Sequence, residues 1–400
     1  MRVLTPYMAA VPTVRLTRST GRWWEGGTMS KRLVVCCDGT WNTPDQQRGG
    51  KPAPTNVTRV ALAVAPEDST GAEQRTFYHR GVGTNRWERI RGGVFGFGLP
   101  RDVRDTYRFL VQNYEPGDEL FFFGFSRGAF TARSTVGFVR NSGILRREHA
   151  DRIGEAYALY RSRNSRKHPS SIEAKLFRRS YSHEPRIHFI GVWDTVGALG
   201  IPLNGLRLVN LLNRRWQFHD TDLSTMVDAA FQALAIDEKR RPFQPTIWKQ
   251  PANADEQQVK QVLEQVWFAG VHCDVGGGYP EPALAEVALR WMVGRAHSCG
   301  LDFQSGAFAP LPSGDAETEQ YTVRYVGPDA FGLLHESRKG FYRLLQPFIR
   351  ELGATDCHEY VASSAVERHQ RIKAYAPPGL VKYLGRDHKV MQVDRRSSGR

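Results

Sequence analysis

Cysteine is scarce in this chain, and its arrangement suggests neither a disulfide scaffold nor a zinc site. There are five cysteines, an odd number, and no C-x-x-C pair occurs. Cys36 and Cys37 are adjacent within an expected strand, so their side chains should point to opposite faces of a sheet. This pattern indicates a reducing compartment and argues against structural zinc.

The sequence also lacks any apolar run of the roughly 20 residues that a membrane-spanning helix needs. Residues 1–28 are basic and hold two prolines between Val3 and Val14, which fits a secretory signal peptide poorly. We expect these residues to be a disordered extension or to precede a start at Met29, and a true leader stays open. The expected location is the cytoplasm, and export by a dedicated secretion system also stays open.

Internal repeats and nucleic-acid-binding motifs are missing too. Neither an RNP aromatic pair nor a zinc-finger spacing occurs, so we expect no nucleic-acid partner. The charge is nevertheless strongly positive, with 55 Lys and Arg against 41 Asp and Glu and a formal net charge of +14. Such a surface favours anionic partners, including an anionic membrane surface, although solubility alone explains it equally well.

The sequence does contain short apolar segments that alternate with helical ones. This alternation predicts an α/β fold, similar to that of α/β-hydrolases, with a mostly parallel sheet and helices on both faces. The expected strands cover residues 33–37, 76–79, 119–123, 187–192 and 266–271. The expected helices cover residues 56–64, 100–114, 129–140, 226–236 and 283–295.

We expect one catalytic domain over residues 29–300. Within it, residues 144–182 are strongly basic and are expected to be helical and exposed, as an insertion or a cap. Residues 301–400 are expected to be a helical or mixed extension that packs on the same domain and ends in a basic tail. The oligomeric state stays open.

The most informative stretch is Phe121 to Ala129. A short aromatic strand runs into Gly-Phe-Ser-Arg-Gly, which fits G-x-S-x-G, and a helix is expected to follow. In this strand-turn-helix context the motif is a nucleophile elbow, which presents Ser126 on a strained turn. Gly124 and Gly128 supply the close approach that such a turn needs. A solvated serine on an ordinary turn is the plainer alternative.

Two further expected strands end in an acid and a histidine. Asp194 follows the strand at residues 187–192, and His272 follows the strand at residues 266–271. The order serine, acid, histidine is the one that α/β-hydrolases use. A serine hydroxyl needs an imidazole to take its proton, and the imidazole needs a carboxylate to orient it. We therefore predict a triad of Ser126, Asp194 and His272.

Each member of this triad has a rival. Asp194 could be only a helix N-cap, and Asp237 and Asp274 are alternative acids. His79 also ends an expected strand and is the main alternative histidine. Three other histidines lie in less informative contexts: His297, His335 and His358.

An oxyanion hole needs two donors. The N–H of Arg127 at the expected helix start is one, and the N–H of Gly39 or Thr40, in the loop after the first strand, is the other. We expect Asp38 and Asn42 to brace this loop, although simple structural caps explain them equally well.

Four motifs together resemble the DUF2235 family. These are Cys37 to Asn42, Gly124 to Ala129, Gly191 to Gly197 and Phe268 to Tyr279. The family is an α/β-hydrolase domain related to the catalytic domain of type VI secretion phospholipase effectors. The resemblance covers about residues 31–300 and implies phospholipase A-type ester hydrolysis. In the related effectors the triad is Ser, Asp and His, which maps onto Ser126, Asp194 and His272.

The leading hypothesis is a serine hydrolase of carboxylic esters, with phospholipid acyl esters as candidate substrates, that needs no metal and no cofactor. Apolar side chains are candidates for an acyl pocket: Phe95, Phe97, Phe125 and Leu206. One alternative is a non-catalytic protein that keeps the hydrolase fold and binds a ligand or a partner. The less favoured alternative is a metal-dependent phosphoesterase that uses the strand-end residues Asp38, Asp194, His272 and Asp274.

Overall fold

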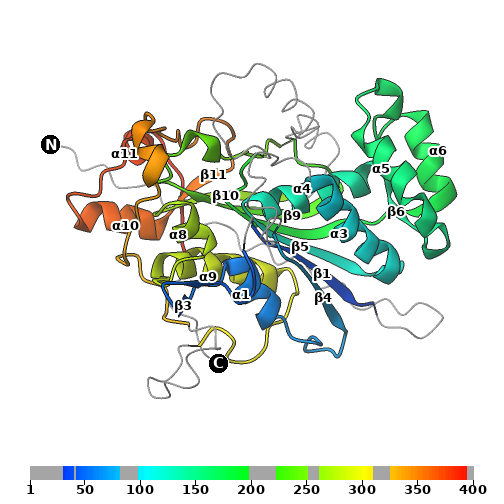
Figure 1. Ribbon diagram of the computed structural model, residues 1–400, viewed down its shortest axis with the longest axis horizontal. Coiled ribbons are helices and arrows are strands. Elements are labelled where there is room, and N and C mark those ends of the chain that lie inside the picture. The colour runs from blue at the N-terminus through cyan, green and yellow to red at the C-terminus, as the bar shows by residue number, and fades with distance from the viewer. Residues whose placement is uncertain are drawn as a thin grey trace.

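One eight-stranded sheet forms the centre of the molecule (Figure 1). The computed structural model describes residues 30–39, 42–81, 98–197, 222–250, 261–309 and 325–393. The strand order is β12-β11-β10-β9-β8-β5-β1-β4, and each strand pairs in parallel with its neighbours. The expected α/β fold with a mostly parallel sheet is therefore confirmed.

The strands of this sheet are β1 (Arg32–Cys37), β4 (Gln74–His79), β5 (Glu119–Phe125), β8 (Ile187–Trp193), β9 (Val227–Ala235), β10 (Val262–Phe268), β11 (Glu359–Ala362) and β12 (Val390–Met391). Two small antiparallel pairs are separate from it: β2 (Gln47–Arg48) with β3 (Lys51–Pro52), and β6 (Ile144–Leu145) with β7 (Ser182–His183).

The helices are α1 (Asn56–Ala63), α3 (Leu99–Asn113), α4 (Arg127–Ser142), α5 (Ile153–Arg161), α6 (Ile172–Tyr181), α8 (His272–Gly276), α9 (Ala283–Ser298), α10 (Ser363–Arg371) and α11 (Pro378–Leu384). Short 3-10 turns are η1 (Arg147–Arg152), η2 (Ser165–Lys167), η3 (Arg241–Phe243) and η5 (Gly340–Leu344). Among the described helices, none is long and apolar enough to cross a bilayer.

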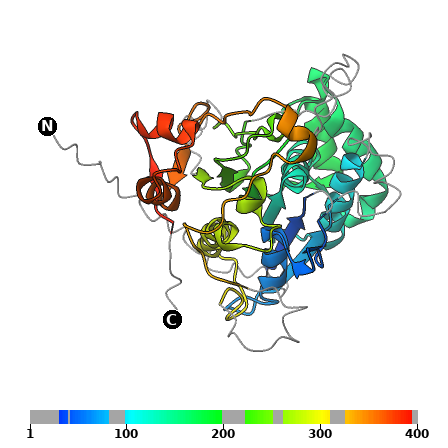
Figure 2. The same cartoon turned by 60° about the vertical axis from the view of Figure 1, so that its left-hand side comes forward.

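Helices pack on both faces of the sheet, as Figures 1 and 2 show, with α3 and α4 on one face and α1 and α9 on the other. This explains the aromatic run in β5. Phe122 packs in the cluster with α3 and α4, whereas Phe121 and Phe123 pack in the cluster with α1 and α9. Successive side chains of a strand point to opposite faces, so a run that is buried throughout needs cover on both. Burial of each ring contributes about 1.5–3 kcal/mol.

The expectation of a helix at residues 226–236 is wrong. These residues form β9, which lies between β8 and β10 in the middle of the sheet. The segment holds four alanines, which favour helix, but it is a short and almost entirely apolar run. Periodicity cannot distinguish such a run from a strand buried on both faces, and here pairing on both sides decides the outcome.

The basic segment at residues 144–182 holds α5 and α6 and lies at the far end of α4 from Ser126. It leaves and rejoins the fold at one place, because β6 and β7 pair through Ile144 opposite His183. Helix α4 begins directly after Ser126 and has 16 residues, which corresponds to about 24 Å. This segment is therefore an insertion beside the C-terminal half of α4 and does not cover Ser126.

The chain after residue 300 joins the same sheet. Strands β11 and β12 extend it beyond β10. The Trp267 indole N–H donates to Glu359 over 2.9 Å, and the Tyr375 hydroxyl donates to Asp237 over 2.9 Å. Asp237, which follows β9, also accepts the Gly270 N–H at 2.7 Å. The division into domains itself stays a prediction.

Several expectations fall outside the described residues. They concern residues 1–28, Thr40, the apolar candidates Phe95, Phe97 and Leu206, and the end of the basic tail.

We predict that Gly128→Ala destabilises the protein by several kcal/mol. A Cβ at this position would lie 2.1 Å from the Cys37 carbonyl oxygen and 2.4 Å from that of Asp38, and backbone cannot move aside easily. Gly154→Ala in α5 is the control, because nothing lies within 4 Å of its added Cβ and alanine favours helix by about 1 kcal/mol. Denaturant unfolding compares the two variants. Equal stability of both would contradict the close contact at Gly128.

We also predict a pH dependence of stability that originates at Asp237. Burial raises the pKa of Asp237 to about 6, more than its hydrogen bonds lower it. An unfolded Asp loses its proton near pH 4. Between about pH 4 and 6 the unfolded chain is therefore ionised first, and stability falls by about 2–3 kcal/mol, then stays level above pH 6.

Asp237→Asn should remove this contribution, so that stability falls by about 2–3 kcal/mol less between pH 4 and 6 than in the wild type. The amide oxygen still accepts both hydrogen bonds. The free energy of unfolding measured from pH 4 to 8 checks this. Glu351→Gln, at an exposed carboxylate, is the matched control and should leave the slope unchanged. A slope in Asp237→Asn equal to that of the wild type would rule out this assignment.

Candidate active site

Ser126 lies at the tip of the turn between β5 and α4. It is the N-cap of α4, with φ 57° and ψ −118°, and it is 8 % exposed. Its N–H donates to the Trp193 carbonyl over 3.1 Å, which ties the turn to the end of β8. A backbone of this kind costs about 1–3 kcal/mol in a residue with a side chain and is concentrated at functional sites.

The glycines of the G-x-S-x-G motif allow α4 to pack tightly against the sheet. A Cβ at Gly124 would lie 2.6 Å from the Cα of Ala129, and one at Gly128 would overlap the end of β1. Neither glycine has a positive φ, so close approach is the reason for both. The strand, turn and helix around Ser126 are those of a nucleophile elbow.

Asp194 is the other strained position. Among the described residues, Ser126 and Asp194 are the two non-glycine residues with positive φ, and that of Asp194 is 40°. Asp194 follows β8, the neighbour of β5 in the sheet, and its side chain is fully buried. Two adjacent strands of the sheet therefore end in strained residues at the same edge.

His272 completes a pair with Asp194. It begins α8, after β10, and its Nδ1 lies 2.6 Å from Asp194 Oδ2. A carboxylate accepts, so Nδ1 carries the hydrogen and Nε2 is left to exchange a proton. The ring packs against Phe125, with 4.6 Å between ring centroids, and meets Phe243 edge-on at 4.9 Å. Because Phe125 directly precedes Ser126, the imidazole lies beside the elbow.

The hydrogen bonds of the described residues do not join Ser126 Oγ to His272 Nε2. Catalytic hydrogen bonds are often long in unliganded enzymes and tighten when substrate binds. What the structure brings together is the elbow and the His272–Asp194 pair, and the catalytic roles stay a prediction.

Arg350 is a member of this site that the sequence did not reveal. Its Nη1 lies 2.6 Å from Asp194 Oδ1, and its Nη2 lies 3.0 Å from Asp194 Oδ2. It also donates to the Ala235 carbonyl over 2.7 Å, and Asp194 accepts the Ala235 N–H at 3.1 Å. Both side chains are almost completely buried. Arg350 lies in a coil segment of an arginine-rich chain, so no sequence signal distinguished it.

These contacts determine the charge of Asp194. Burial alone would raise the pKa of Asp194, but the Arg350 guanidinium and then His272 outweigh it and hold the pKa well below its usual range. Asp194 is therefore an anion at any physiological pH. An ionised carboxylate that accepts from an imidazole is what a triad acid must be.

The rival acids have other partners. Asp274 accepts the Val271 N–H at 3.0 Å and contacts His335 Nδ1 at 2.6 Å. Asp237 accepts hydrogen bonds from the Gly270 N–H and from the Tyr375 hydroxyl of the C-terminal segment. The rival histidine His79 ends β4, at the edge of the sheet beyond β1, and lies 3.8 Å from Asp102. Neither acid bonds His272, whereas Asp194 does.

Asp38 and Asn42 lie in the loop after β1. Asp38 Oδ1 accepts from the Gly39 N–H at 2.6 Å and from Asn42 Nδ2 at 3.4 Å. Asp38 Oδ2 accepts from three hydroxyls, those of Thr55, Thr58 and Tyr78. Burial raises the pKa of Asp38 despite these donors. These bonds would let Asp38 brace the loop, as the sequence predicts.

The two N–H groups expected to form the oxyanion hole, those of Arg127 and Gly39, differ in their surroundings. Arg127 is the first residue of α4, directly after Ser126, so its N–H lies at the N-terminus of the helix. Gly39 lies close to the nucleophile, since a Cβ on it would be 3.3 Å from the Ser126 Cβ. Its N–H, however, is bonded to Asp38 in this structure. Thr40 lies outside the described residues, so the second donor stays a prediction.

The four residues of the alternative metal site do not form one cluster, although two of them, Asp194 and His272, contact each other. Asp38, Asp194 and Asp274 accept hydrogen bonds in three separate networks. Within the described ranges, the group of His, Cys, Asp and Glu side chains that is tight enough to share an ion is elsewhere, just before β11, and consists of Asp356, Cys357 and His358.

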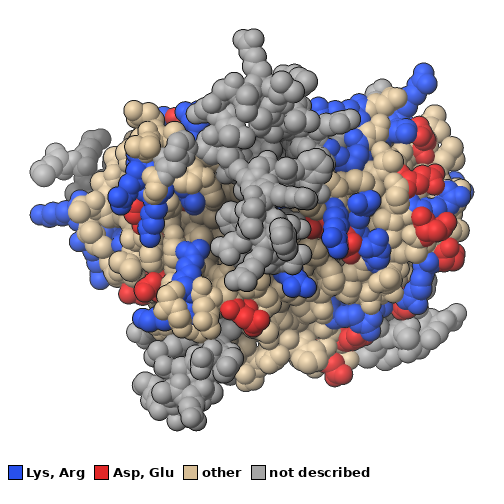
Figure 3. Space-filling view, in the orientation of Figure 1, with Lys and Arg blue, Asp and Glu red and all other residues tan. Residues whose placement is uncertain are grey.

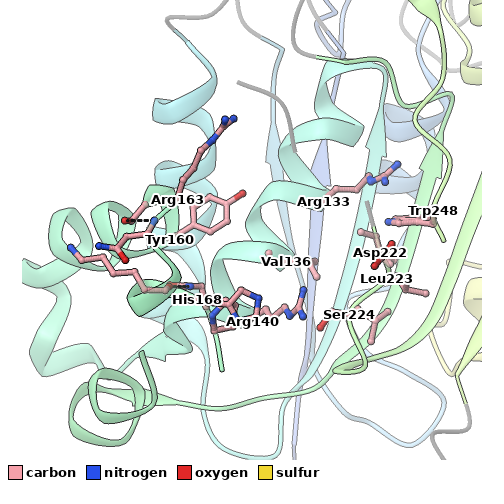
Figure 4. A pocket seen from close by; sticks show the side chains of 18 residues that line it. Arg133, Val136, Arg140, Tyr160, Arg163, His168, Asp222, Leu223, Ser224 and Trp248 are labelled. Carbon is pink, nitrogen blue, oxygen red and sulfur yellow. Dashed lines mark hydrogen bonds between the residues drawn. The ribbon is translucent and has the colours of Figure 1, made fainter. Parts of the chain in front are cut away.

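A cavity of about 500 Å³ lies away from this site (Figure 4). It opens between the second half of α4 and the insertion, and Arg133, Arg140 and Trp248 are among its lining residues. Neither Ser126 nor His272 lines it. The cavity is therefore separate from the candidate catalytic residues.

Comparison with known proteins finds similarity to two proteins that are both described as uncharacterized. The uncharacterized protein YEL023C of Saccharomyces cerevisiae is 26% identical over 235 residues, which cover 53% of this chain and 32% of that protein. An uncharacterized protein from Pseudomonas aeruginosa with a crystal structure is 16% identical, with a TM-score of 0.40 over 74% of this chain and 49% of that one. The chain thus spans about a third of the length of the yeast protein.

A family model gives the clearer result. The model described as the catalytic domain of Tle1-like phospholipase effectors of type VI secretion matches residues 31–295. This span holds the elbow, Asp194 and His272, and it ends before Arg350. It confirms the resemblance seen in the sequence motifs. The chain belongs to the family of Tle1-like phospholipase effector catalytic domains.

Proposed function

We propose that this protein is a serine hydrolase of carboxylic esters and that its substrates are phospholipid acyl esters. The observation that carries the proposal is the strained Ser126 at a nucleophile elbow beside the buried His272–Asp194 pair. Membership of a phospholipase effector family supports the lipid substrate. The proposed chemistry uses neither a metal ion nor a cofactor.

In the first half-reaction, Ser126 Oγ attacks the acyl carbonyl carbon while His272 Nε2 takes the hydroxyl proton. The carbonyl oxygen becomes an oxyanion, which the Arg127 N–H at the start of α4 stabilises. When the intermediate collapses, the bond to the leaving alcohol breaks and His272 returns the proton to that alcohol. The products are a lysophospholipid and an acyl-enzyme.

In the second half-reaction, water attacks the acyl-enzyme, with His272 again as base. A second oxyanion forms at the same donors, and its collapse releases a fatty acid and restores Ser126. Asp194 keeps the imidazole in the required tautomer and stabilises it while it carries the extra proton. Burial of this pair strengthens the electrostatic contact.

Arg350 acts through Asp194 as a positioning residue. Its two nitrogens contact both carboxylate oxygens, so the carboxylate cannot rotate away from the imidazole. Its positive charge also offsets part of the penalty for burying an anion. Arg350 is not expected to touch substrate.

We predict that Ser126→Ala and His272→Ala each lower the hydrolysis of p-nitrophenyl esters by about three orders of magnitude or more. Both variants should also lose labelling by a fluorophosphonate probe, which reacts with activated serines. Esters of several chain lengths separate an esterase from a lipase.

A surface pair offers a matched control. Ser170 Oγ lies 2.7 Å from His168 Nδ1 in an exposed turn, so Ser170→Ala and His168→Ala remove a serine and a histidine that touch. Both should keep activity and labelling. Full activity in Ser126→Ala, or no labelling of a folded wild type under any condition, would refute the hydrolase proposal and favour a binding protein.

For Arg350 we predict an effect on turnover and on its pH profile. Arg350→Lys keeps the charge but cannot contact both carboxylate oxygens, so kcat should fall about tenfold or more with little change in KM. Arg350→Met removes the guanidinium that compensates the buried charge of Asp194, which costs about 3–5 kcal/mol of stability. In that variant the low-pH limb of kcat/KM should move to higher pH, because the protonated imidazole faces an uncompensated anion.

Arg371→Met is the control, since Arg371 is exposed and pairs with Glu367 on the surface. It should leave both profiles unchanged. An Arg350 variant that loses stability but keeps the wild-type kcat and pH profile would make Arg350 purely structural.

A further inference from the structure

The segment at residues 335–350, which we call the C-terminal strap, is fastened at both ends to the candidate site. At one end, Ser337 Oγ donates to Glu238 Oε1 over 2.9 Å. Glu238 Oε2 in turn accepts the backbone N–H of His272 at 3.4 Å. At the other end, Arg350 bonds Asp194. The strap therefore runs along the edge of the sheet that carries the His272–Asp194 pair.

Between these ends the strap packs on η3 and on Lys239, two residues before it. The Phe348 N–H donates to the Lys239 carbonyl over 2.8 Å. The Arg241 guanidinium lies 5.5 Å from the centre of the Phe348 ring. Phe243, the last residue of η3, is the side chain that meets His272 edge-on. The strap and residues 239–243 thus form one continuous surface next to the imidazole.

Two apolar side chains of the strap project into solvent. Leu344 is 82 % exposed and Ile349 is 53 % exposed. A single exposed apolar residue is common on soluble proteins and needs no explanation. Here two lie within six residues of each other on a segment that is held beside the candidate site.

The same surface is basic. Within residues 239–241 and the strap, the exposed charged side chains are one acid, Glu336, and four cations, Lys239, Arg241, Lys339 and Arg343. Figure 3 shows that Lys and Arg side chains lie on the left and on the right of this face of the molecule, with Asp and Glu among them. An exposed apolar pair among cations matches an anionic lipid surface, which offers negative head groups above an apolar layer.

We propose that the C-terminal strap, with Lys239 and Arg241, is the surface by which this protein docks onto anionic phospholipid membranes. Leu344 and Ile349 enter the boundary between head groups and acyl chains, and the four cations contact the head groups. Docking in this way places the edge that holds Ser126 and His272 toward the lipid. The proposal rests on the proposed function for its biological meaning, because it identifies how that site meets its substrate.

Vesicle binding tests this proposal without catalysis. The protein carries Ser126→Ala, so that no lipid is consumed, and its co-sedimentation is measured with vesicles of phosphatidylcholine alone and of phosphatidylcholine with phosphatidylglycerol. The parent should bind the anionic vesicles, bind neutral vesicles weakly, and dissociate as salt rises. Leu344→Asp with Ile349→Asp should weaken binding at least about tenfold. Lys339→Glu with Arg343→Glu should weaken it about fivefold or more for each charge reversed.

A matched control lies on α6, at the far end of α4. Leu176 is 59 % exposed and Lys175 beside it is exposed. Leu176→Asp with Lys175→Glu therefore makes one change of each kind on a basic helix away from the strap, and vesicle binding should not change. Circular dichroism confirms that each variant is folded.

Three results would overturn the proposal: a parent that does not bind anionic vesicles, strap variants that bind as the parent does, or α6 variants that lose binding equally. The last result would mean adsorption by overall charge. The vesicle assay uses a protein without Ser126, so it can show docking even if the hydrolase proposal fails. Ester hydrolysis and labelling can in turn support the hydrolase proposal even if the strap does not bind vesicles.

Discussion

A buried carboxylate held between a guanidinium and an imidazole is the interaction on which the candidate site depends. Asp194 could not stay ionised in the interior without a cation, because burial favours the neutral acid. Arg350 supplies that cation from a segment more than 150 residues further along the chain. As a result, an acid that follows a central strand keeps its charge, and His272 has a fixed partner. The site is thus assembled by the C-terminal part of the chain as well as by the sheet.

Backbone strain is a second constraint, and the packing around it explains how the fold tolerates it. Ser126 and Asp194 both have positive φ, and they are linked because the Ser126 N–H bonds the carbonyl of Trp193, the residue before Asp194. Each strained turn is therefore held by the other. Gly128 lets α4 approach the end of β1 so closely that the elbow cannot relax. Local strain persists where surrounding structure leaves no alternative.

Much of the fold and the main candidate site residues could be predicted, because parallel strands that are buried on both faces are visible in the sequence as short apolar runs. Ser126, Asp194 and His272 each follow an apolar run, and the carboxyl ends of parallel strands meet at one edge. The sequence predicts a helix where β9 lies, because four alanines favour helix and nothing in a short apolar run reveals the pairing that buries it. Arg350 and Glu238 could not be found, since they come from coil and act through contacts between distant segments. The position of the insertion at the far end of α4 also depends on tertiary geometry alone.

The pairing of β10 with β11 has a consequence for how this family domain can be isolated. The matched family region stops at residue 295, but β10 has a neighbour on each side only because residues 359–362 pair with it. In a fragment limited to that region, β10 would become an edge strand with unpaired N–H and carbonyl groups along one side. Such edges recruit other chains. The apolar strand that positions His272 would then be a template for aggregation, so the residues beyond the family region are part of what shields β10 from pairing with other chains.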